Sequence, residues 1–158
     1  MQNYQRDEQR PKMYVTPERT KPAEPKQFPK YCAIVLNQVS KKRLMEQMVG
    51  FLEELPLGWK VDCDHLTLKM GGLTDEYVNI IPNTPVRMQV VEVGIMRGSI
   101  IAVRAEPSGG IESRNKIPHI TITYNEAAGV KPRQSNDIVE WHVVRYPFWL
   151  SGNIKEIY

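Results

Sequence analysis

Two of the three histidines in this chain stand in the same local pattern. "HLTL" occupies residues 65–68 and "HITI" occupies residues 119–122, so His65 and His119 are each followed two places later by a threonine. In a β-strand, residues two apart point to the same side, while the residue between them points to the other. Each motif is therefore predicted to present an imidazole and a hydroxyl side by side, anchored by apolar residues in the core.

The two residue types suit phosphate chemistry. An imidazole titrates near neutral pH and can give or take a proton, and a threonine hydroxyl donates a hydrogen bond to an anion without adding charge. Two such pairs that face one another across a cleft would supply a general acid, a general base and two donors to phosphate oxygens. We therefore expect His65, Thr67, His119 and Thr121 to be catalytic in phosphodiester cleavage or cyclic-phosphate hydrolysis, with no metal and no cofactor. Either histidine could be the base.

The other metal-binding residue types offer a weaker alternative. By the two-residue period, Cys63 falls on the face of His65, so a zinc site with the two motif histidines is conceivable. Zinc thiolate sites usually contain more than one cysteine. Acid–base chemistry therefore explains the two histidines better than a zinc site does. Both cysteines of the chain lie in apolar runs and are expected to be reduced and buried. The third histidine, His142, has no threonine partner, and we assign it a structural role.

The charge of the chain divides it into two parts. Residues 1–30 contain seven Lys and Arg against four Asp and Glu, together with five prolines, whereas residues 31–158 contain fourteen of each charge. A proline-rich, charged segment cannot bury enough apolar surface to offset its ordering entropy. We predict a disordered basic leader over 1–30, either a plain linker or an arm that helps to hold RNA, and one domain over 31–158. The neutral domain argues against a broad phosphate-tracking groove.

Hydrophobic periodicity within the domain predicts one clear helix and about seven strands. This content indicates an α+β domain with mostly antiparallel sheets. Ser40 is the expected N-cap of the helix, and Gly98 with Ser99 is expected to join two strands in a tight hairpin. A second, short helix has room only around 74–81. The expected strands are 31–37, 59–70, 86–98, 99–107, 119–124, 138–146 and 148–158, and the expected helix is 41–55.

The sequence argues against a membrane-spanning segment and against a signal peptide. No apolar stretch approaches the length that spans a bilayer, and the polar N-terminus lacks the apolar centre of a signal peptide. We expect a cytoplasmic protein with no membrane partner, in the host cytoplasm if the source is a virus.

The two motifs, in this order among the expected elements, make residues 31–158 resemble the 2H phosphoesterases, a superfamily with two H-x-T/S-x motifs. The segments "GWKVDCDHLTLKMG" and "SRNKIPHITITYNEAAGVKPRQSNDI" resemble most the RNA-repair-like branch, some members of which are attached to RNA ligases. The resemblance implies a bilobal fold in which two small antiparallel sheets face a central cleft, each lobe contributing one motif. It also implies metal-free activity on 2',3'-cyclic phosphates, 2'-5' linkages or related nucleotide phosphoesters. Because 108–118 is a loop here, where many relatives have a helix, we expect a smaller second lobe and a more open cleft.

Residues beside the motifs are candidates for substrate contacts. Arginine and lysine position phosphate, serine and asparagine donate from loops, and a tyrosine can stack on a base. The candidates are Lys69, Arg114, Lys116, Tyr124, Lys131, Arg133, Ser135 and Asn136.

Together these features predict a monomeric, metal-independent phosphodiesterase that hydrolyses 2',3'-cyclic phosphate ends of RNA or small cyclic nucleotides by histidine acid–base catalysis. Two other functions remain open at this point. One is a viral-type hydrolase of cyclic oligonucleotide defence signals, and the other is a non-catalytic module that binds RNA ends or nucleotides.

Overall fold

The computed structural model describes residues 24–50, 57–73 and 80–158. Strands hold 47% of these residues and helices 17%. Most of the expected leader, part of the expected main helix and most of the expected short helix lie outside the described residues. In chain order the elements are β1 (Tyr31–Leu36), α1 (Gln38–Gln47), β2 (Lys60–Val61), β3 (His65–Met70), β4 (Pro85–Met96), β5 (Ile100–Pro107), β6 (His119–Tyr124), the 3-10 helices η2 (Glu126–Ala128) and η3 (Pro132–Asp137), and β7 (Glu140–Ile157).

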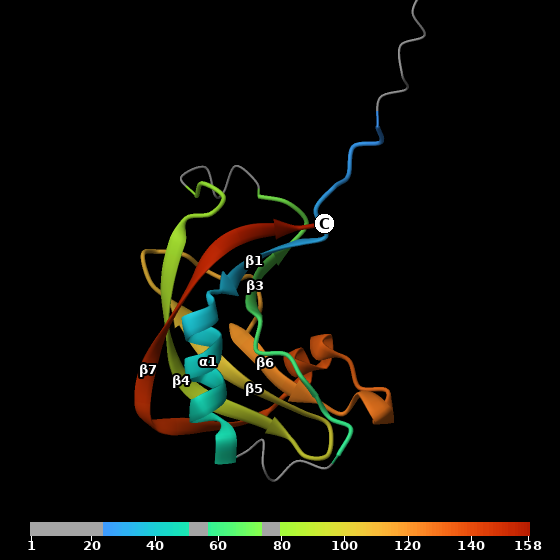
Figure 1. Ribbon diagram of the computed structural model, residues 1–158, viewed down its shortest axis with the longest axis vertical. Coiled ribbons are helices and arrows are strands. Elements are labelled where there is room, and N and C mark those ends of the chain that lie inside the picture. The colour runs from blue at the N-terminus through green and yellow to red at the C-terminus, as the bar shows by residue number, and fades with distance from the viewer. Residues whose placement is uncertain (1–23, 51–56, 74–79) are drawn as a thin grey trace, which may run out of the picture.

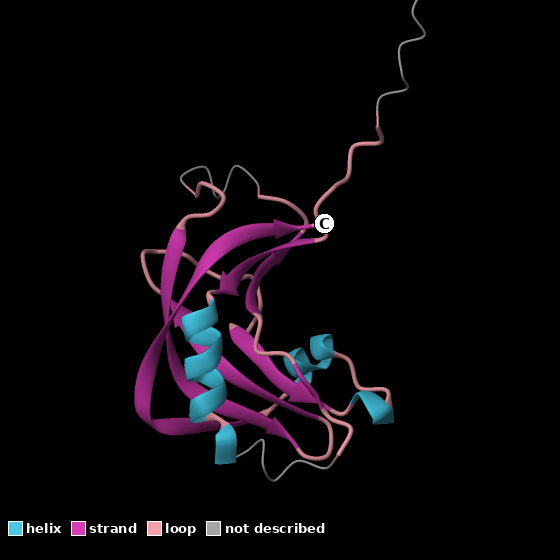
Figure 2. Ribbon diagram, in the orientation of Figure 1, coloured by secondary structure: helices cyan, strands magenta, loops and turns pink. Residues whose placement is uncertain are grey.

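Six of the strands form a closed antiparallel barrel. Their order is β6-β3-β1-β7-β4-β5, and β5 pairs back with β6. The short strand β2 extends the pairing along the C-terminal half of β6. In Figure 1, β7 runs beside β4 along the length of the barrel and ends next to β1. Figure 2 shows α1 and the two 3-10 helices lying outside this curved sheet.

The barrel interior is filled by alternating apolar side chains. One buried cluster receives a residue from every barrel strand, which places it inside the closed sheet. Leu44 and Met48 of the α1 segment pack against the same cluster. A smaller cluster lies where the segment after β6 covers β5 and β6. The strand residues of the main cluster include Ile34, Leu66, Leu68, Met88, Val90, Val103, Ile120, Ile122, Leu150 and Ile154.

The expected α+β, bilobal fold with two facing sheets is wrong. The strand positions were largely predictable, but their connection was not: β5 hydrogen-bonds to β6 along five residue pairs, from Ile100↔Tyr124 to Arg104↔His119. This pairing joins the two ends of the sheet, so no gap between two lobes remains. The hairpin between β4 and β5 is confirmed, with Gly98 at a φ of 72°.

The final strand is one element instead of the two that were predicted. β7 pairs with β4 between Glu140 and Asn153, but the register shifts between Val90↔Phe148 and Glu92↔Val143. More residues of β7 than of β4 lie between these two pairs, so β7 must bulge there. Pro147 lies in this bulge, where its missing N–H costs no ladder hydrogen bond. The proline mimics a strand end in the sequence.

The helix begins earlier than the sequence predicted. Asn37, not Ser40, is the N-cap, and its side chain accepts a hydrogen bond from the Ser40 backbone N–H at 2.8 Å. The Ser40 hydroxyl instead accepts a bond from the backbone N–H of Ser151 at 2.7 Å, which ties α1 to β7. No described helix is long and apolar enough to cross a membrane.

A glycine in β7 allows close approach of β1. A Cβ built on Gly152 would collide with the backbone carbonyl of Val35 and lie 2.9 Å from Ile34 Cγ2. We expect Gly152→Ala to lower the free energy of unfolding by about 1–3 kcal/mol, because the two strands must separate. Gly50→Ala is the matched control, since a Cβ at Gly50 meets no atom within 4 Å. Urea denaturation measures both, and an unchanged midpoint for Gly152→Ala would contradict this account.

Candidate active site

The four predicted catalytic side chains line one cavity. It has a volume of about 500 Å³ and receives residues from β1, β3, β6, η3 and the segments before β3 and β6. The lining residues are Tyr31, Asp62, Asp64, His65, Thr67, Met70, Asn115, His119, Thr121, Pro132, Arg133, Ser135 and Asn136.

Strand pairing brings the two motifs together. β3 and β6 are antiparallel neighbours, and Leu66 is paired with Ile120. Both of these residues are fully buried in the barrel core. Because side chains alternate along a strand, the residues that flank each of them point to the other face. The two H-x-T pairs therefore lie side by side on one sheet, and not on opposite lobes as the resemblance implied.

The expectation that Cys63 shares the face of His65 is wrong. The predicted strand 59–70 is broken after β2, and Cys63 adopts a φ of 51°. This kink resets the alternation, so the Cys63 side chain is 1% exposed in the core cluster while His65 faces the cavity. Burial raises the pKa of the Cys63 thiol to about 12. Cys63 therefore does not lie beside His65 on one face, as the zinc alternative required.

His119 is held at both ring nitrogens. Nδ1 lies 2.7 Å from the carbonyl oxygen of Ile117, which can only accept, so Nδ1 carries a hydrogen. Nε2 lies 2.8 Å from the hydroxyl of Ser135. The side chain of His119 is almost buried, and this burial lowers its pKa below the usual value. The hydrogen bond to Ile117 opposes this shift, and the charge of His65 adds to it.

His65 has a different environment. Its Nδ1 lies 3.2 Å from Asp64 Oδ2, and its ring stacks on that of Tyr31 with centroids 5.3 Å apart. The other carboxylate oxygen of Asp64 accepts a hydrogen bond from Lys41 of α1. A carboxylate can only accept from an imidazole, so the His65 Nδ1 is the donor. The chain Lys41–Asp64–His65 thus orients the ring from behind.

Two carboxylates make one side of the cavity acidic. Burial raises the pKa of Asp62, and the nearby Asp64 adds to that rise. Burial also acts to raise the pKa of Asp64, but hydrogen bonds and charge from Lys41 and His65 outweigh it, and the pKa is lowered. The pKa of Tyr31 is raised by burial and by both carboxylates. Asp64 is therefore ionised at neutral pH beside His65.

The predicted substrate contacts divide into two groups. Arg133, Ser135 and Asn136 line the cavity from η3. The other five, Lys69, Arg114, Lys116, Tyr124 and Lys131, are not among the described residues that line it. Tyr124 is buried in the smaller core cluster, where the aromatic ring packs with Ile100 and Ile138. Lys131 is the N-cap residue of η3 and is exposed.

Sequence reasoning missed several lining residues. Asp64 is the direct neighbour of His65 in "DCDHLTL", so its proximity to the imidazole could have been inferred. Tyr31 and Asn115 carry no such signal, because they reach the cavity only through the β1–β3 pairing and the path of the 108–118 loop. The backbone N–H of Arg114 bonds to the Leu68 carbonyl at 2.7 Å and fixes that path.

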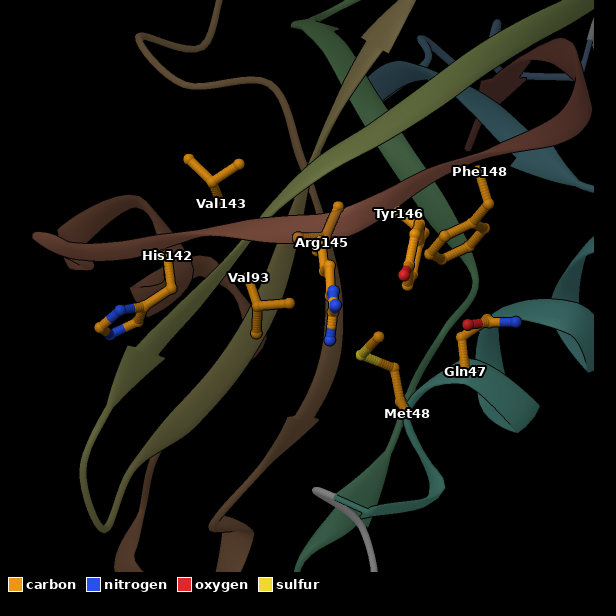
Figure 3. Close-up of a pocket in the computed structure, with 9 residues that line it drawn as sticks. Gln47, Met48, Val93, His142, Val143, Arg145, Tyr146 and Phe148 are labelled. Atoms are coloured by element: carbon orange, nitrogen blue, oxygen red, sulfur yellow. The ribbon is translucent and has the colours of Figure 1, made fainter.

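A second hollow of about 350 Å³ lies between α1 and β7. Figure 3 shows Met48, Tyr146 and Phe148 gathered with Arg145, while the His142 ring lies away from this group. His142 is exposed, and its Nε2 lies 2.9 Å from Glu140 Oε1. The described residues that line this hollow include one histidine and no pair comparable with His65 and His119, so the histidine-lined cavity is the candidate active site.

Comparison with known families gives a match. The sequence model described as the fungal tRNA ligase phosphodiesterase domain matches residues 72–155, which is more than half of the chain. The matched range includes β4 to β6 and most of β7, with the second H-x-T motif, while the first motif precedes it. No curated protein and no solved structure matches the chain.

Burial of His119 makes a pH-dependent prediction. The free-solution pKa is about 6.5, and we expect the imidazole of His119 to titrate below this value, as its burial disfavours the charged form. The unfolded chain then takes up this proton first, so the free energy of unfolding should fall as the pH drops from about 6.5 towards the folded pKa. NMR titration, with His119→Gln to assign the resonance, measures the pKa. A value at or above that of a free histidine would contradict the burial argument.

Proposed function

We propose, because the chain belongs to the fungal tRNA ligase phosphodiesterase domain family, that it is a phosphodiesterase acting on 2',3'-cyclic phosphate ends of RNA. This family is a branch of the 2H phosphoesterases associated with RNA ligases, so the resemblance drawn from the two motifs is confirmed at the level of the family. The activity itself rests on the family and on the chemistry of the cavity. The same arguments favour hydrolysis by two histidines without a metal.

The observation that carries the proposal is the pairing of β3 with β6. It places both H-x-T pairs on one face, and that face lines one cavity. Diagonal neighbours on paired strands have Cα atoms about 7–8 Å apart. A tetrahedral phosphate fits between two imidazoles at that spacing, so one group can contact both histidines.

The surroundings of His119 suit a general base. Its lowered pKa leaves the imidazole neutral at neutral pH. The Nδ1 hydrogen is held by the Ile117 carbonyl, which leaves the lone pair on Nε2. In the ligand-free protein the Ser135 hydroxyl lies 2.8 Å from Nε2, so the attacking water must take the place of this hydroxyl. A neutral, oriented imidazole can take a proton from an attacking water molecule.

The surroundings of His65 suit a general acid. The ionised carboxylate of Asp64 accepts from Nδ1 and fixes the orientation of the ring. Lys41 holds that carboxylate in place from α1. A protonated imidazole oriented in this way can give its Nε2 proton to a leaving oxygen.

These roles combine into one balanced hydrolytic step. Water attacks the phosphorus while His119 takes one of its protons, and the bond from phosphorus to one ribose oxygen breaks. That oxygen takes a proton from His65, which leaves a phosphomonoester beside a free hydroxyl. The hydroxyls of Thr67 and Thr121 donate to the non-bridging phosphate oxygens, where negative charge increases in the transition state. The orientation of the ribose decides whether the 2'- or the 3'-phosphate is formed.

The charges around the cavity favour a single phosphodiester group. Arg133 is the cation that η3 brings to the lining, which also contains the carboxylates of Asp62 and Asp64. An arginine attracts a phosphate, whereas two carboxylates repel additional anions. Asn115 and Asn136 can donate to or accept from a ribose or a base edge. A terminal nucleotide with one cyclic phosphate matches this distribution.

Removal of either histidine tests the mechanism. We expect His65→Ala and His119→Ala each to lower kcat on a 2',3'-cyclic phosphate RNA end by about 100-fold or more, because each loses one proton transfer. His142→Ala is the matched control and should retain activity, since His142 lies outside the cavity. Product formation is followed by chromatography with EDTA present throughout.

The same assay separates the rival functions. A 2'-5' dinucleotide and a cyclic oligonucleotide are tested beside the cyclic-phosphate RNA. Turnover of only the cyclic oligonucleotide would replace the proposed substrate, and binding without turnover of any substrate would indicate a non-catalytic module. Loss of activity in EDTA would exclude the metal-free mechanism.

Arg133 should act mainly in binding. We expect Arg133→Ala to raise KM by about tenfold with a smaller change in kcat, because one charge-assisted contact with phosphate is lost. Arg97→Ala, on the exposed turn between β4 and β5, removes the same charge at a residue that does not line the cavity and is the control. Steady-state kinetics at fixed ionic strength measures both variants. An equal effect of the two substitutions would show that only net charge matters.

A further inference from the structure

Ser135 is a buried polar residue that the proposed mechanism does not use. Its side chain is 2% exposed, although it borders the cavity from η3. The hydroxyl oxygen has three close neighbours: His119 Nε2 at 2.8 Å, the Pro132 carbonyl oxygen at 2.6 Å and Thr121 Oγ1 at 3.0 Å. One hydroxyl thus connects the candidate base to the threonine of its own motif.

With a neutral His119, these contacts cannot all be hydrogen bonds. The Nδ1 hydrogen is held by Ile117, so Nε2 is an acceptor, and the Pro132 carbonyl is an acceptor as well. Ser135 has one proton and can donate it to only one of them. Thr121 can donate to the Ser135 oxygen, so two of the three contacts are satisfied and one pairs two acceptors.

With a protonated His119, all three contacts become hydrogen bonds. Nε2–H then donates to the Ser135 oxygen, and Ser135 turns its own proton to the Pro132 carbonyl. The oxygen of Ser135 has two lone pairs and can still accept from Thr121 while no phosphate is bound. Buried polar groups without partners are costly, so the network favours the charged form of the ring. This contribution opposes the desolvation of His119.

The other charged groups near His119 do not replace this partner. His65 on β3 lowers its pKa, and Arg133 on η3 adds a second positive charge to the lining. Asp62 and Asp64 lie on the same cavity wall as His65. On the opposite strand β5, Arg104 is paired with His119 in register, but its guanidinium bonds to Glu92 and Glu106. Within the described residues, Ser135 is the side chain in hydrogen-bond contact with Nε2.

We propose that Ser135 is a positioning residue for His119, whose hydroxyl changes from donor to acceptor when the imidazole gains a proton. In the ligand-free protein it thereby holds the ring in one orientation in both protonation states, ready for the water that replaces this contact during catalysis. The proposal rests on the proposed function for its catalytic meaning, but the contact itself can be tested without substrate. The η3 segment therefore positions the His119 ring in addition to covering β5 and β6.

The experiment compares the titration of His119 in the ligand-free wild-type protein and in Ser135→Ala and Ser135→Cys. We expect the midpoint to fall by about one pH unit in both variants, because the charged ring loses its acceptor. The cysteine variant fills the buried space but hydrogen-bonds weakly, so it remains informative if the alanine variant does not fold. Ser108→Ala is the matched control, since the exposed Ser108 hydroxyl also donates to a carbonyl, that of Arg87 at 2.9 Å.

Activity adds a second measurement. We expect kcat to fall by about tenfold with little change in KM, and the acidic limb of the pH profile to move to lower pH. A midpoint of His119 that stays at the wild-type value in a folded Ser135 variant would overturn the proposal, as would an equal shift in Ser108→Ala. If the wild-type protein has no phosphodiesterase activity, the proposed function fails, whereas the midpoint shift still decides the role of Ser135.

Discussion

The site depends on one cross-strand pair, Leu66 opposite Ile120. Each of these residues is the second position of an H-x-T motif, and both are fully buried in the barrel core. Their burial forces the flanking histidines and threonines to the outer face of β3 and β6. A shift of either strand by one residue would turn the histidine and threonine of that strand into the core, so the hydrophobic driving force that closes the barrel also sets the geometry of the candidate site.

The same fold gives two identical residue types different properties. His119 lies on β6, between β3 and β5, where burial disfavours the charged form of its ring. His65 begins β3 at the cavity edge, where Asp64 and Lys41 hold it through a hydrogen-bonded chain from α1. A pair of histidines with a symmetric pattern in the sequence thus becomes an asymmetric pair in space. In the proposed mechanism, this asymmetry is what assigns the base to one histidine and the acid to the other.

Much of the local structure was predictable, because it depends on neighbours in the chain. The runs that became β1, β5 and β6 alternate or cluster apolar residues, and Gly98 supplies the turn between β4 and β5. The helix was predicted, but its start was not, since Asn37 and Ser40 are both acceptable caps and only the contact of Ser40 with Ser151 distinguishes them. The kink at Cys63 was missed because a non-glycine residue with positive φ leaves no trace in an alternating pattern.

The sequence by itself determined the chemistry: two imidazole–hydroxyl pairs, the strands that present them and the family to which they point. These follow from residue type and from the two-residue period, which act over a few positions. Only the tertiary structure decided that the sheet closes into a barrel, that the pairs share one sheet, and that Asp64, Tyr31 and Ser135 surround them. Those outcomes depend on hydrogen bonds and packing between segments far apart in the chain, for which a single sequence carries no periodic signal.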